Sequence, residues 1–327
     1  EILYQDGLLI LSVNEEARKP SANNKTPVKK SVCVIDADSG KMLWKQGVFT
    51  GLSAKYDSAQ PFGRLEMTVG DGQVFLADHN AIVSLDLKSG VEKWRTPRPE
   101  FEEQLRMYFM RMSDECVLVY QDGVVLFAQP DMKKERSWHT LPGTLHAYDA
   151  KNGRELWQHG YGAWAHNGQP DVFVIDGLVW LAEHMDVEFP KHEPLNKDQI
   201  DYADIGLDLK TGELKRRLST SKINNVDHHH RCYRGKATEL FLLSSRRGVE
   251  FLDLATGDND LNHWARGGCL HGIVPCNGLL YLTPHPCKCY IETLLNGYNA
   301  LAPESVPAPS PRSKDSESTR FEQGPAY

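Results

Sequence analysis

Short apolar stretches with strand-like alternation recur along the first 300 residues or so, and each ends at a turn signal. One pattern is an apolar strand, an aspartate, two or three residues, a glycine and then often a tryptophan, as in "CVIDADSGKMLW" (33–44). Alternating apolar residues predict a half-buried strand, and Asp followed by Gly predicts a tight turn in which Gly takes a positive φ. The pattern occurs five times, with its aspartates 45 to 63 residues apart, at Asp36, Asp86, Asp149, Asp208 and Asp253.

A second pattern, a turn dipeptide followed by an apolar strand, precedes most of these repeats. It is written "QDGLLIL", "GDGQVFLA", "QDGVVLFA", "IDGLVWLA" and "CNGLLYLT". Asp-Gly and Asn-Gly favour two-residue hairpin turns. Two hairpins per repeat give four short strands per unit, which is typical of a propeller blade. The sequence therefore predicts five blades and a sixth that begins at Cys276, with the tryptophan of the fifth repeat at Trp264.

The segments "YDAKNGRELWQH" and "LDLKTGELKRRL" resemble the repeat of the pyrroloquinoline-quinone-like (quinoprotein alcohol dehydrogenase-like) β-propellers. That family includes quinoprotein alcohol dehydrogenases and the propeller lipoprotein of outer-membrane protein assembly. The resemblance implies an all-β fold, a quinoprotein-like β-propeller of four-stranded blades that is incomplete, with about five and a half of an expected seven or eight blades. Residues 227–302 more narrowly resemble a segment of large predicted secreted propeller proteins of planctomycete-type bacteria. Because one fold hosts many functions, no activity follows from the fold alone.

We expect the propeller to span residues 1–302. Residues 303–327, rich in Pro and Ser, are expected to form a linker or disordered tail. The chain starts inside a strand-like pattern, "EILYQDGLLILSV", which suggests a fragment of a longer protein. Open sheet edges invite strand pairing, so further blades or a neighbouring propeller domain of the full-length chain are expected to close the ring.

Histidine, cysteine and arginine residues are concentrated on loops predicted to share one face of the propeller. In a four-stranded antiparallel blade, the turns joining strands one to two and three to four lie at one face, and all other connections lie at the opposite face. The second set of loops contains the candidate ligand-binding residues His166, His184, Asp186, His228, His229, His230, Arg234, Arg246, Arg266, His271 and His285. It also contains the clustered cysteines Cys232, Cys269, Cys287 and Cys289. Binding residues tend to sit on loops held by a rigid scaffold, so this face is the predicted site.

The segments "DHHHRCYRGKAT" and "PHPCKCY" offer nitrogen and thiolate ligands that suit zinc or copper. Adjacent strand residues point to opposite sides, so at most two of His228, His229 and His230 can meet one ion. In an exported protein the four clustered cysteines could instead form disulfides, with three possible connectivities. Free thiols are the third alternative. Cys33 and Cys116 lie in apolar strands and are expected to be buried.

The features of a quinoprotein dehydrogenase are incomplete in this sequence. By the resemblance, such enzymes carry an adjacent cysteine pair, a stacking tryptophan and calcium ligands. The sequence has no Cys-Cys dipeptide and no C-x-x-C-H haem motif. Trp164 and Trp180 are candidates to stack on a ring, although tryptophan in a propeller more often belongs to the core between blades. The sequence therefore does not favour pyrroloquinoline quinone as a cofactor.

Charged residues on the predicted face suggest an anion site. Arginine forks match carboxylates and sulfates, and histidine beside a carboxylate can act as a general acid and base, so an acidic sugar is a candidate ligand or substrate. The set consists of His184, Asp186, Glu188, His229, Arg234, Arg246 and Arg266. The alternative is that these are ordinary solvated loop residues.

Charge and composition narrow the classes of partner. The net charge is −7 and the basic residues are scattered, which argues against a nucleic-acid partner. No apolar run reaches the roughly 18 residues of a membrane-spanning helix. The family resemblance and the cysteine clustering favour an extracytoplasmic location, either periplasmic or secreted. We therefore expect a non-catalytic exported scaffold that binds a protein or glycan on this face, with an enzyme acting on acidic carbohydrate as the alternative.

Overall fold

The computed structural model describes residues 1–15, 29–51, 65–99, 116–130, 140–164, 170–183, 201–223, 233–244, 248–268, 271–284, 295 and 297–303. The regular secondary structure in these ranges consists of β-strands only, arranged in six antiparallel sheets. Five sheets have four strands that pair in chain order, and the sixth has three. We call each sheet a blade and number the blades along the chain.

The first blade consists of β1 (Ile2–Gln5), β2 (Leu8–Asn14), β3 (Lys29–Asp36) and β4 (Met42–Thr50). The second consists of β5 (Glu66–Gly70), β6 (Gln73–Ala77), β7 (Ala81–Asp86) and β8 (Glu92–Pro97), and the third of β9 (Val117–Gln121), β10 (Val124–Pro130), β11 (Thr140–Asp149) and β12 (Glu155–Trp164). The fourth consists of β13 (Phe173–Ile175), β14 (Leu178–Ala182), β15 (Ala203–Asp208) and β16 (Leu214–Ser219). The fifth consists of β17 (Lys236–Ala237), β18 (Phe241–Ser244), β19 (Val249–Asp253) and β20 (Asn259–Asn262), and the sixth of β21 (Ile273–Cys276), β22 (Leu279–Leu282) and β23 (Asn299–Leu301).

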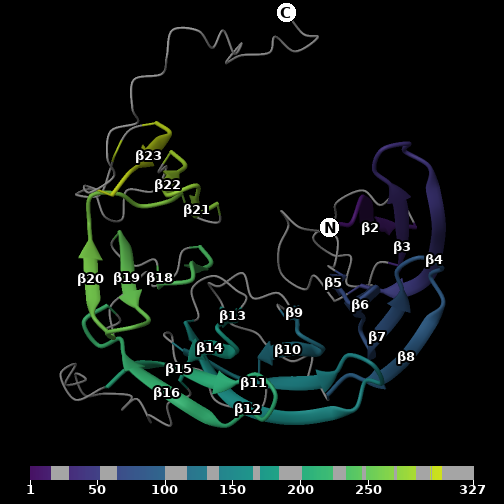
Figure 1. Cartoon of the computed structure of the whole chain (residues 1–327), viewed down its shortest axis with the longest axis horizontal. Helices are drawn as coiled ribbons and strands as arrows, with labels where there is room; N and C mark the ends of the chain where they lie inside the picture. The colour runs from purple at the N-terminus through teal and green to yellow at the C-terminus, as the bar shows by residue number, and fades with distance from the viewer. Residues whose placement is uncertain are drawn as a thin grey trace, which may run out of the picture.

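The blades follow one another in an open arc, with β1–β4 near one end and β21–β23 near the other (Figure 1). Neighbouring blades meet through their first strands, as β5 does with β1 and β9. The fold is therefore an incomplete β-propeller with four-stranded blades, which confirms the predicted all-β propeller. The sixth blade begins at Ile273 rather than at Cys276.

Two kinds of turn were recognised in the sequence, and both have the expected backbone conformation. Between β5 and β6, Asp71 and Gly72 have φ values of 50° and 68°, the left-handed conformation that two-residue hairpin turns need. Between β3 and β4, the Asp36 carboxylate accepts a hydrogen bond from Ser39 N at 2.8 Å, and Gly40 has a φ of 69°. The hydrogen bonds from Ser39 hold the pKa of Asp36 below its usual value.

These turns define the two ends of each blade. The "turn end" carries the Asp-Gly turns between strands one and two and the Asp-x-x-x-Gly turns between strands three and four. The "loop end" carries the connections between strands two and three and the connections from blade to blade. The strand order places the two ends at opposite edges of every four-stranded blade, as the sequence predicted.

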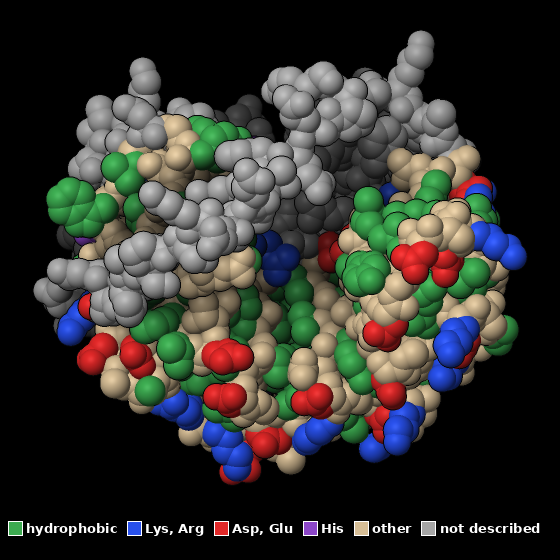
Figure 2. All heavy atoms as spheres, turned by 45° about the horizontal axis from the view of Figure 1, so that its top comes forward, with side chains coloured by type: hydrophobic (Ala, Val, Ile, Leu, Met, Phe, Trp, Pro, Cys, Tyr) green, Lys and Arg blue, Asp and Glu red, His purple; other side chains and the backbone are tan. Residues whose placement is uncertain are grey.

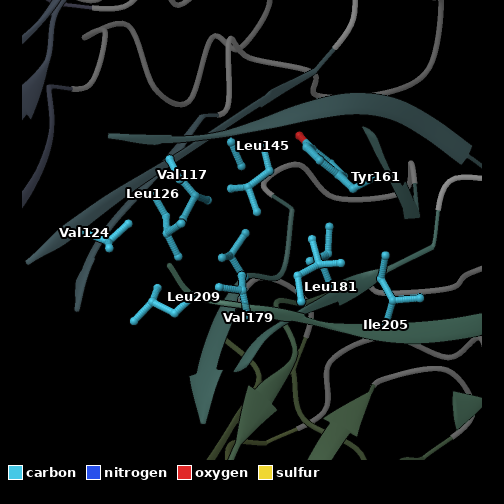
Figure 3. Close-up of a cluster of buried hydrophobic side chains, with 13 residues drawn as sticks. Val117, Val124, Leu126, Leu145, Tyr161, Val179, Leu181, Ile205 and Leu209 are labelled. Carbon is cyan, nitrogen blue, oxygen red and sulfur yellow. The ribbon is translucent and has the colours of Figure 1, made fainter. Parts of the chain in front are cut away.

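The core lies between the faces of neighbouring blades. Figure 3 shows the cluster between the third and fourth blades, in which Val124, Leu126 and Leu145 of one blade face Val179 and Leu181 of the next. Alternate residues of each inner strand face opposite neighbours, so β6 and β10 are apolar at nearly every position.

A repeated contact, which we call the joint, fastens each of the first four blades to the next. The indole Nε1 of Trp44 donates a hydrogen bond to the carbonyl oxygen of Leu87 at 2.8 Å, across to the turn of the second blade. The same bond joins Trp94 to Ala150 at 2.9 Å and Trp157 to Leu209 at 3.0 Å. In each case the acceptor directly follows the turn aspartate. The tryptophan of the repeat is therefore a fastener between blades.

The fourth and fifth blades depart from this rule. Arg216 occupies the tryptophan position of the fourth blade and donates to the carbonyl oxygen of Leu254, which follows Asp253. In the fifth blade the equivalent position is Leu261, which is 51% exposed. Trp264, at which the fifth repeat of the sequence pattern ends, lies beyond β20, three residues past the joint position, and is 79% exposed.

Candidate functional site

Three of the predicted site residues lie within the described part of the chain: Arg234, Arg266 and His271. All three lie on loop-end connections, which lead into the fifth and sixth blades. Arg234 and His271 are exposed, whereas Arg266 is buried at 2% exposure. The other candidates lie outside the described residues, namely His166, His184, Asp186, His228, His229, His230, Arg246, His285, Cys232, Cys269, Cys287 and Cys289.

Tyr233, next to Arg234, links the loop ends of the fifth and sixth blades. Its side chain is 2% exposed, and its hydroxyl donates to the carbonyl oxygen of Gly248 at 3.2 Å. The same hydroxyl accepts a hydrogen bond from Gly267 N at 3.4 Å. Arg266 lies beside this contact, so its guanidinium belongs to a buried junction between blades rather than to an open cleft. This placement does not favour Arg266 as a surface ligand for an anion.

Carboxylates at the loop end brace the backbone of the same region. Asp171 accepts hydrogen bonds from Gly235 N at 3.1 and 3.2 Å, which ties the entry of the fourth blade to the entry of the fifth. Glu250 is 1% exposed and accepts a hydrogen bond from Gly248 N at 3.0 Å. A buried carboxylate needs such donors, because an uncompensated charge there is costly.

Asp204 is a titratable group that the sequence prediction missed. It stands at the loop-end start of β15, with its side chain partly buried. Burial, followed by the negative charge of Asp171, raises its pKa from 3.8 to about 7. The available signal was an acidic residue at the loop-end start of an apolar strand, in "DYADIGLD". Near neutral pH this carboxyl can therefore give up or accept a proton.

Arg217 forms a second charged group at the loop end of the fourth blade. Its Nη1 lies 2.7 Å from Asp201 Oδ2, and its Nη2 lies 2.7 Å from Glu183 Oε2. The hydrogen bonds to Glu183, and after them those to Asp201, raise the pKa of Arg217. In turn, the hydrogen bond from Arg217 is the main reason that the pKa of Asp201 is lowered. The guanidinium is thus held between two carboxylates of its own blade.

The metal and disulfide hypotheses concern residues outside the described part. Within the described part, no group of three or more His, Cys, Asp or Glu side chains is placed to hold a metal ion. Cys33 and Cys116 are buried, at 4% and 0% exposure, which confirms their expected burial in apolar strands. Cys276 is free and exposed at a turn of the turn end.

The described residues do not fit a quinone site built on Trp180. This side chain is 2% exposed and packs with Ile223 and Leu242 in the core between the fourth and fifth blades. The guanidinium carbon of Arg216 lies 5.8 Å from the centre of its ring. A ring enclosed in this way has no face left for a planar cofactor. The side chain of Trp164, the other candidate, lies outside the described residues.

Charges of both signs are mixed on the visible surface. Figure 2 shows acidic and basic side chains alternating along the lower rim, with hydrophobic side chains above them. No field of one sign dominates the part of the face that is described, in line with the modest net charge of −7. The described residues include no helix that is long and apolar enough to span a membrane.

Comparison with solved structures gives distant matches. BamB from Moraxella catarrhalis is 14% identical, with 80% of this chain and 68% of that one covered and a TM-score of 0.41. A quinohemoprotein alcohol dehydrogenase from Pseudomonas putida HK5 is 11% identical, with 86% and 50% covered and a TM-score of 0.47. The enzyme of the same type from Comamonas testosteroni is 13% identical, with 86% and 50% covered and a TM-score of 0.45. The chain thus spans half the length of these two dehydrogenases.

A search of curated proteins gave no match. A family model does match: the one described as outer membrane protein assembly factor BamB aligns with residues 22–176. This segment contains the turn aspartates Asp36, Asp86 and Asp149 and the tryptophans that fasten their blades. Residues 22–176, with three of the five turn repeats, therefore match the repeat of the pyrroloquinoline-quinone-like β-propellers.

Proposed function

We propose that this chain is part of a non-catalytic, exported β-propeller scaffold that binds a protein partner at the loop end. The matched family model is described as an outer membrane protein assembly factor, and by analogy the partner is a protein and the location is outside the cytoplasm. Of the protein and glycan ligands that the sequence left open, this analogy favours the protein.

One observation carries the scaffold part of the proposal: the charged groups of the loop end are used to brace the propeller itself. Arg217 is held between Glu183 and Asp201, and Asp171 and Glu250 each accept a backbone N–H. Groups fixed in this way give a rigid platform, and rigid platforms suit loops that recognise another macromolecule. The exposed side chain of His271 lies on one of these loop-end connections and can contact the partner.

Site-specific photo-cross-linking in the native host tests the proposal. A photoreactive amino acid replaces Arg234 or His271 at the loop end, and Lys88 or Lys151, both exposed, at the turn end. We expect discrete protein adducts from the two loop-end positions and none from the turn-end positions. Equal adducts from both ends would refute a loop-end partner site. If the purified protein is retained on an acidic polysaccharide and no protein adducts form, the ligand of the loop end is a glycan and not a protein.

Export makes a separate prediction for the clustered cysteines. An oxidising compartment allows disulfides among Cys232, Cys269, Cys287 and Cys289, which would pin loops of the fifth and sixth blades. Peptide mass mapping without reduction is expected to find at least one of these bridges. Four free thiols in protein isolated with rapid alkylation, or stoichiometric zinc or copper lost on substituting Cys232, would contradict this account of the cysteines.

A second candidate function rests on the pair formed by Asp171 and Asp204. A carboxyl with a pKa of about 7 next to a carboxylate suits general acid–base catalysis, for example on an acidic carbohydrate. The test is release of reducing ends from acidic polysaccharides by the full-length protein. Activity that is lost in Asp204→Asn but retained in Asp201→Asn would favour the enzyme. No release from any of the polysaccharides would leave the scaffold as the assignment.

A further inference from the structure

The turn between β3 and β4 has the form of a joint acceptor, but no side chain of the described residues fastens it. In the second, third and fourth blades, the turn glycine lies under the tryptophan of the preceding blade. A Cβ added at Gly90 would lie 2.7 Å from the Trp44 ring, and one at Gly153 would lie 2.5 Å from the Trp94 ring. Gly40 has the same backbone conformation, with φ at 69°, yet among the described residues no heavy atom comes within 4 Å of its added Cβ.

The face of the first blade on the same side is apolar and is only partly covered by the described residues. Successive residues of a strand point to opposite faces of the sheet. Ile10 and Val34 of the first blade point toward the second blade, so the residues next to them in each strand point to the opposite side. One row of cross-strand neighbours on that other side consists of Tyr4, Leu9, Ile35 and Met42. Tyr4 is 66% exposed, and Leu9 and Ile35 at the centre of the row are half-buried.

The equivalent row of the second blade shows what normally covers these positions. Leu85 directly precedes the turn aspartate of the second blade, as Ile35 does in the first. Val74 is the cross-strand partner of Leu85, as Leu9 is of Ile35. Val74 and Leu85 are both 0% exposed, because they pack against the first blade. The half-buried Leu9 and Ile35 therefore match two positions that, in the second blade, are fully buried by another blade.

No described blade of this chain has a fastener left for Gly40. Trp44, Trp94, Trp157 and Arg216 are each bound to the blade that follows them. The fifth blade has Leu261 at this position, which carries no side-chain donor. The described strands of the sixth blade, β21 to β23, contain neither tryptophan nor arginine, and this blade lies at the other end of the arc (Figure 1).

We propose that the Asp36–Gly40 turn and the apolar row beside it form an open joint that accepts a further blade of the same polypeptide. The incoming blade is of the same repeat and carries a tryptophan or arginine eight residues after its turn aspartate, the spacing of Asp36 and Trp44. Its side chain covers Gly40 and donates to the carbonyl oxygen of Ala37, the residue that corresponds to Leu87 in the joint of the second blade. Continuity with the four joints of this chain identifies the occupant.

A chain extended by one blade tests this joint. A copy of residues 65–115, which brings β5 to β8 and Trp94, is placed directly before Glu1 of the 327-residue chain. Hydrogen exchange of β1 to β4 is compared with that of the unextended chain, and we expect it to slow by about ten-fold or more. In the matched control the copied tryptophan is replaced by serine, and the slowing is expected to disappear. Equal exchange in the extended chain and its serine control would overturn the proposal.

Substitutions of two turn glycines test whether the joint at Gly40 is open, by comparison with the closed joint at Gly90. Asparagine tolerates the left-handed conformation but adds a side chain. In the 327-residue chain, Gly90→Asn is expected to lower the unfolding midpoint, because it displaces Trp44, while Gly40→Asn leaves it nearly unchanged. In the full-length polypeptide, Gly40→Asn is expected to be as damaging as Gly90→Asn. A silent Gly40→Asn in the full-length polypeptide would contradict the proposal, as would a homodimer of the 327-residue chain that Gly40→Asn dissociates.

Discussion

Arg216 donates a hydrogen bond to the carbonyl oxygen of Leu254, at the place where the preceding blades use a tryptophan. A second bond, from Arg216 Nη2, reaches the carbonyl oxygen of Ala255 at 3.3 Å. The guanidinium also lies over Trp180. The joint is thus defined by its acceptor, the carbonyl after the turn aspartate, and two different side chains can fill it. A planar group with an N–H donor is what indole and guanidinium share.

The tryptophan joints should carry a measurable part of the stability. Trp94 is 8% exposed and bonded to Ala150, so Trp94→Phe is expected to cost about 1 kcal/mol or somewhat more, from the lost hydrogen bond. Trp94→Ala removes the buried ring as well and is expected to cost about 3–5 kcal/mol. Urea unfolding measures both. Trp264→Phe, at a 79% exposed position, is the matched control and should leave the unfolding free energy unchanged.

Arg216 should behave as a fastener and not as a surface charge. Arg216→Lys keeps the positive charge but loses the planar fork over Trp180, and we expect it to lower the unfolding free energy by about 1 kcal/mol. Lys215→Ala, at the neighbouring exposed position, should change it by less than about 0.5 kcal/mol. If the two variants unfold at the same urea concentration, the joint role of Arg216 is wrong.

The turn glycines should differ according to what lies above them. Gly153 and Gly72 both have positive φ, so alanine strains the backbone by about 1–2 kcal/mol at either position. Only at Gly153 would the new Cβ collide with Trp94, which adds about 1–3 kcal/mol of overpacking. Gly153→Ala is therefore expected to lower the thermal midpoint more than Gly72→Ala. Equal effects would mean that the contact with Trp94 adds nothing to the cost of backbone strain.

Asp204 should make the protein less stable as the pH rises toward neutrality. Its pKa in the folded protein, about 7, lies above the usual 3.8, so the folded state binds the proton more tightly than the unfolded chain. This contribution is complete below about pH 4 and is lost as the pH rises to about 7. Asp204→Asn is expected to flatten that decline in urea unfolding measured from about pH 4 to 8. Asp201→Asn should do the reverse and lose stability at neutral pH, because the pKa of Asp201 is lowered. Parallel profiles for wild type and Asp204→Asn would contradict the assignment.

The turn end was predictable from the sequence because local chemistry decides it. Asp36 with Gly40, and Asp71 with Gly72, encode their turns within a few residues, and the strands on either side follow from apolar alternation. The joints were predictable only in part. Tryptophan signalled them where it was present, but the arginine at position 216 could be identified as its substitute only from the bond to Leu254.

The loop end was harder to predict because its contacts join residues far apart in the chain. Asp171 and Gly235 are 64 residues apart, and neither belongs to the recurring turn patterns. Arg266 looked like a surface ligand, but it is buried at a junction of blades that only the fold creates. Asp204 could not be identified from the sequence, because its raised pKa depends on burial and on the charge of Asp171, and both arise only in the folded protein.

The most direct test of the account is a hydrogen-exchange footprint of the full-length protein with the partner captured by cross-linking at Arg234. The account predicts slower exchange at the loop end, in residues 233–235 and 265–272, and unchanged exchange at the turn end, in residues 36–40, 86–90 and 208–212. Protection confined to the turn-end segments, or spread evenly over both ends, would contradict the claim that this propeller presents its loop end to a protein partner.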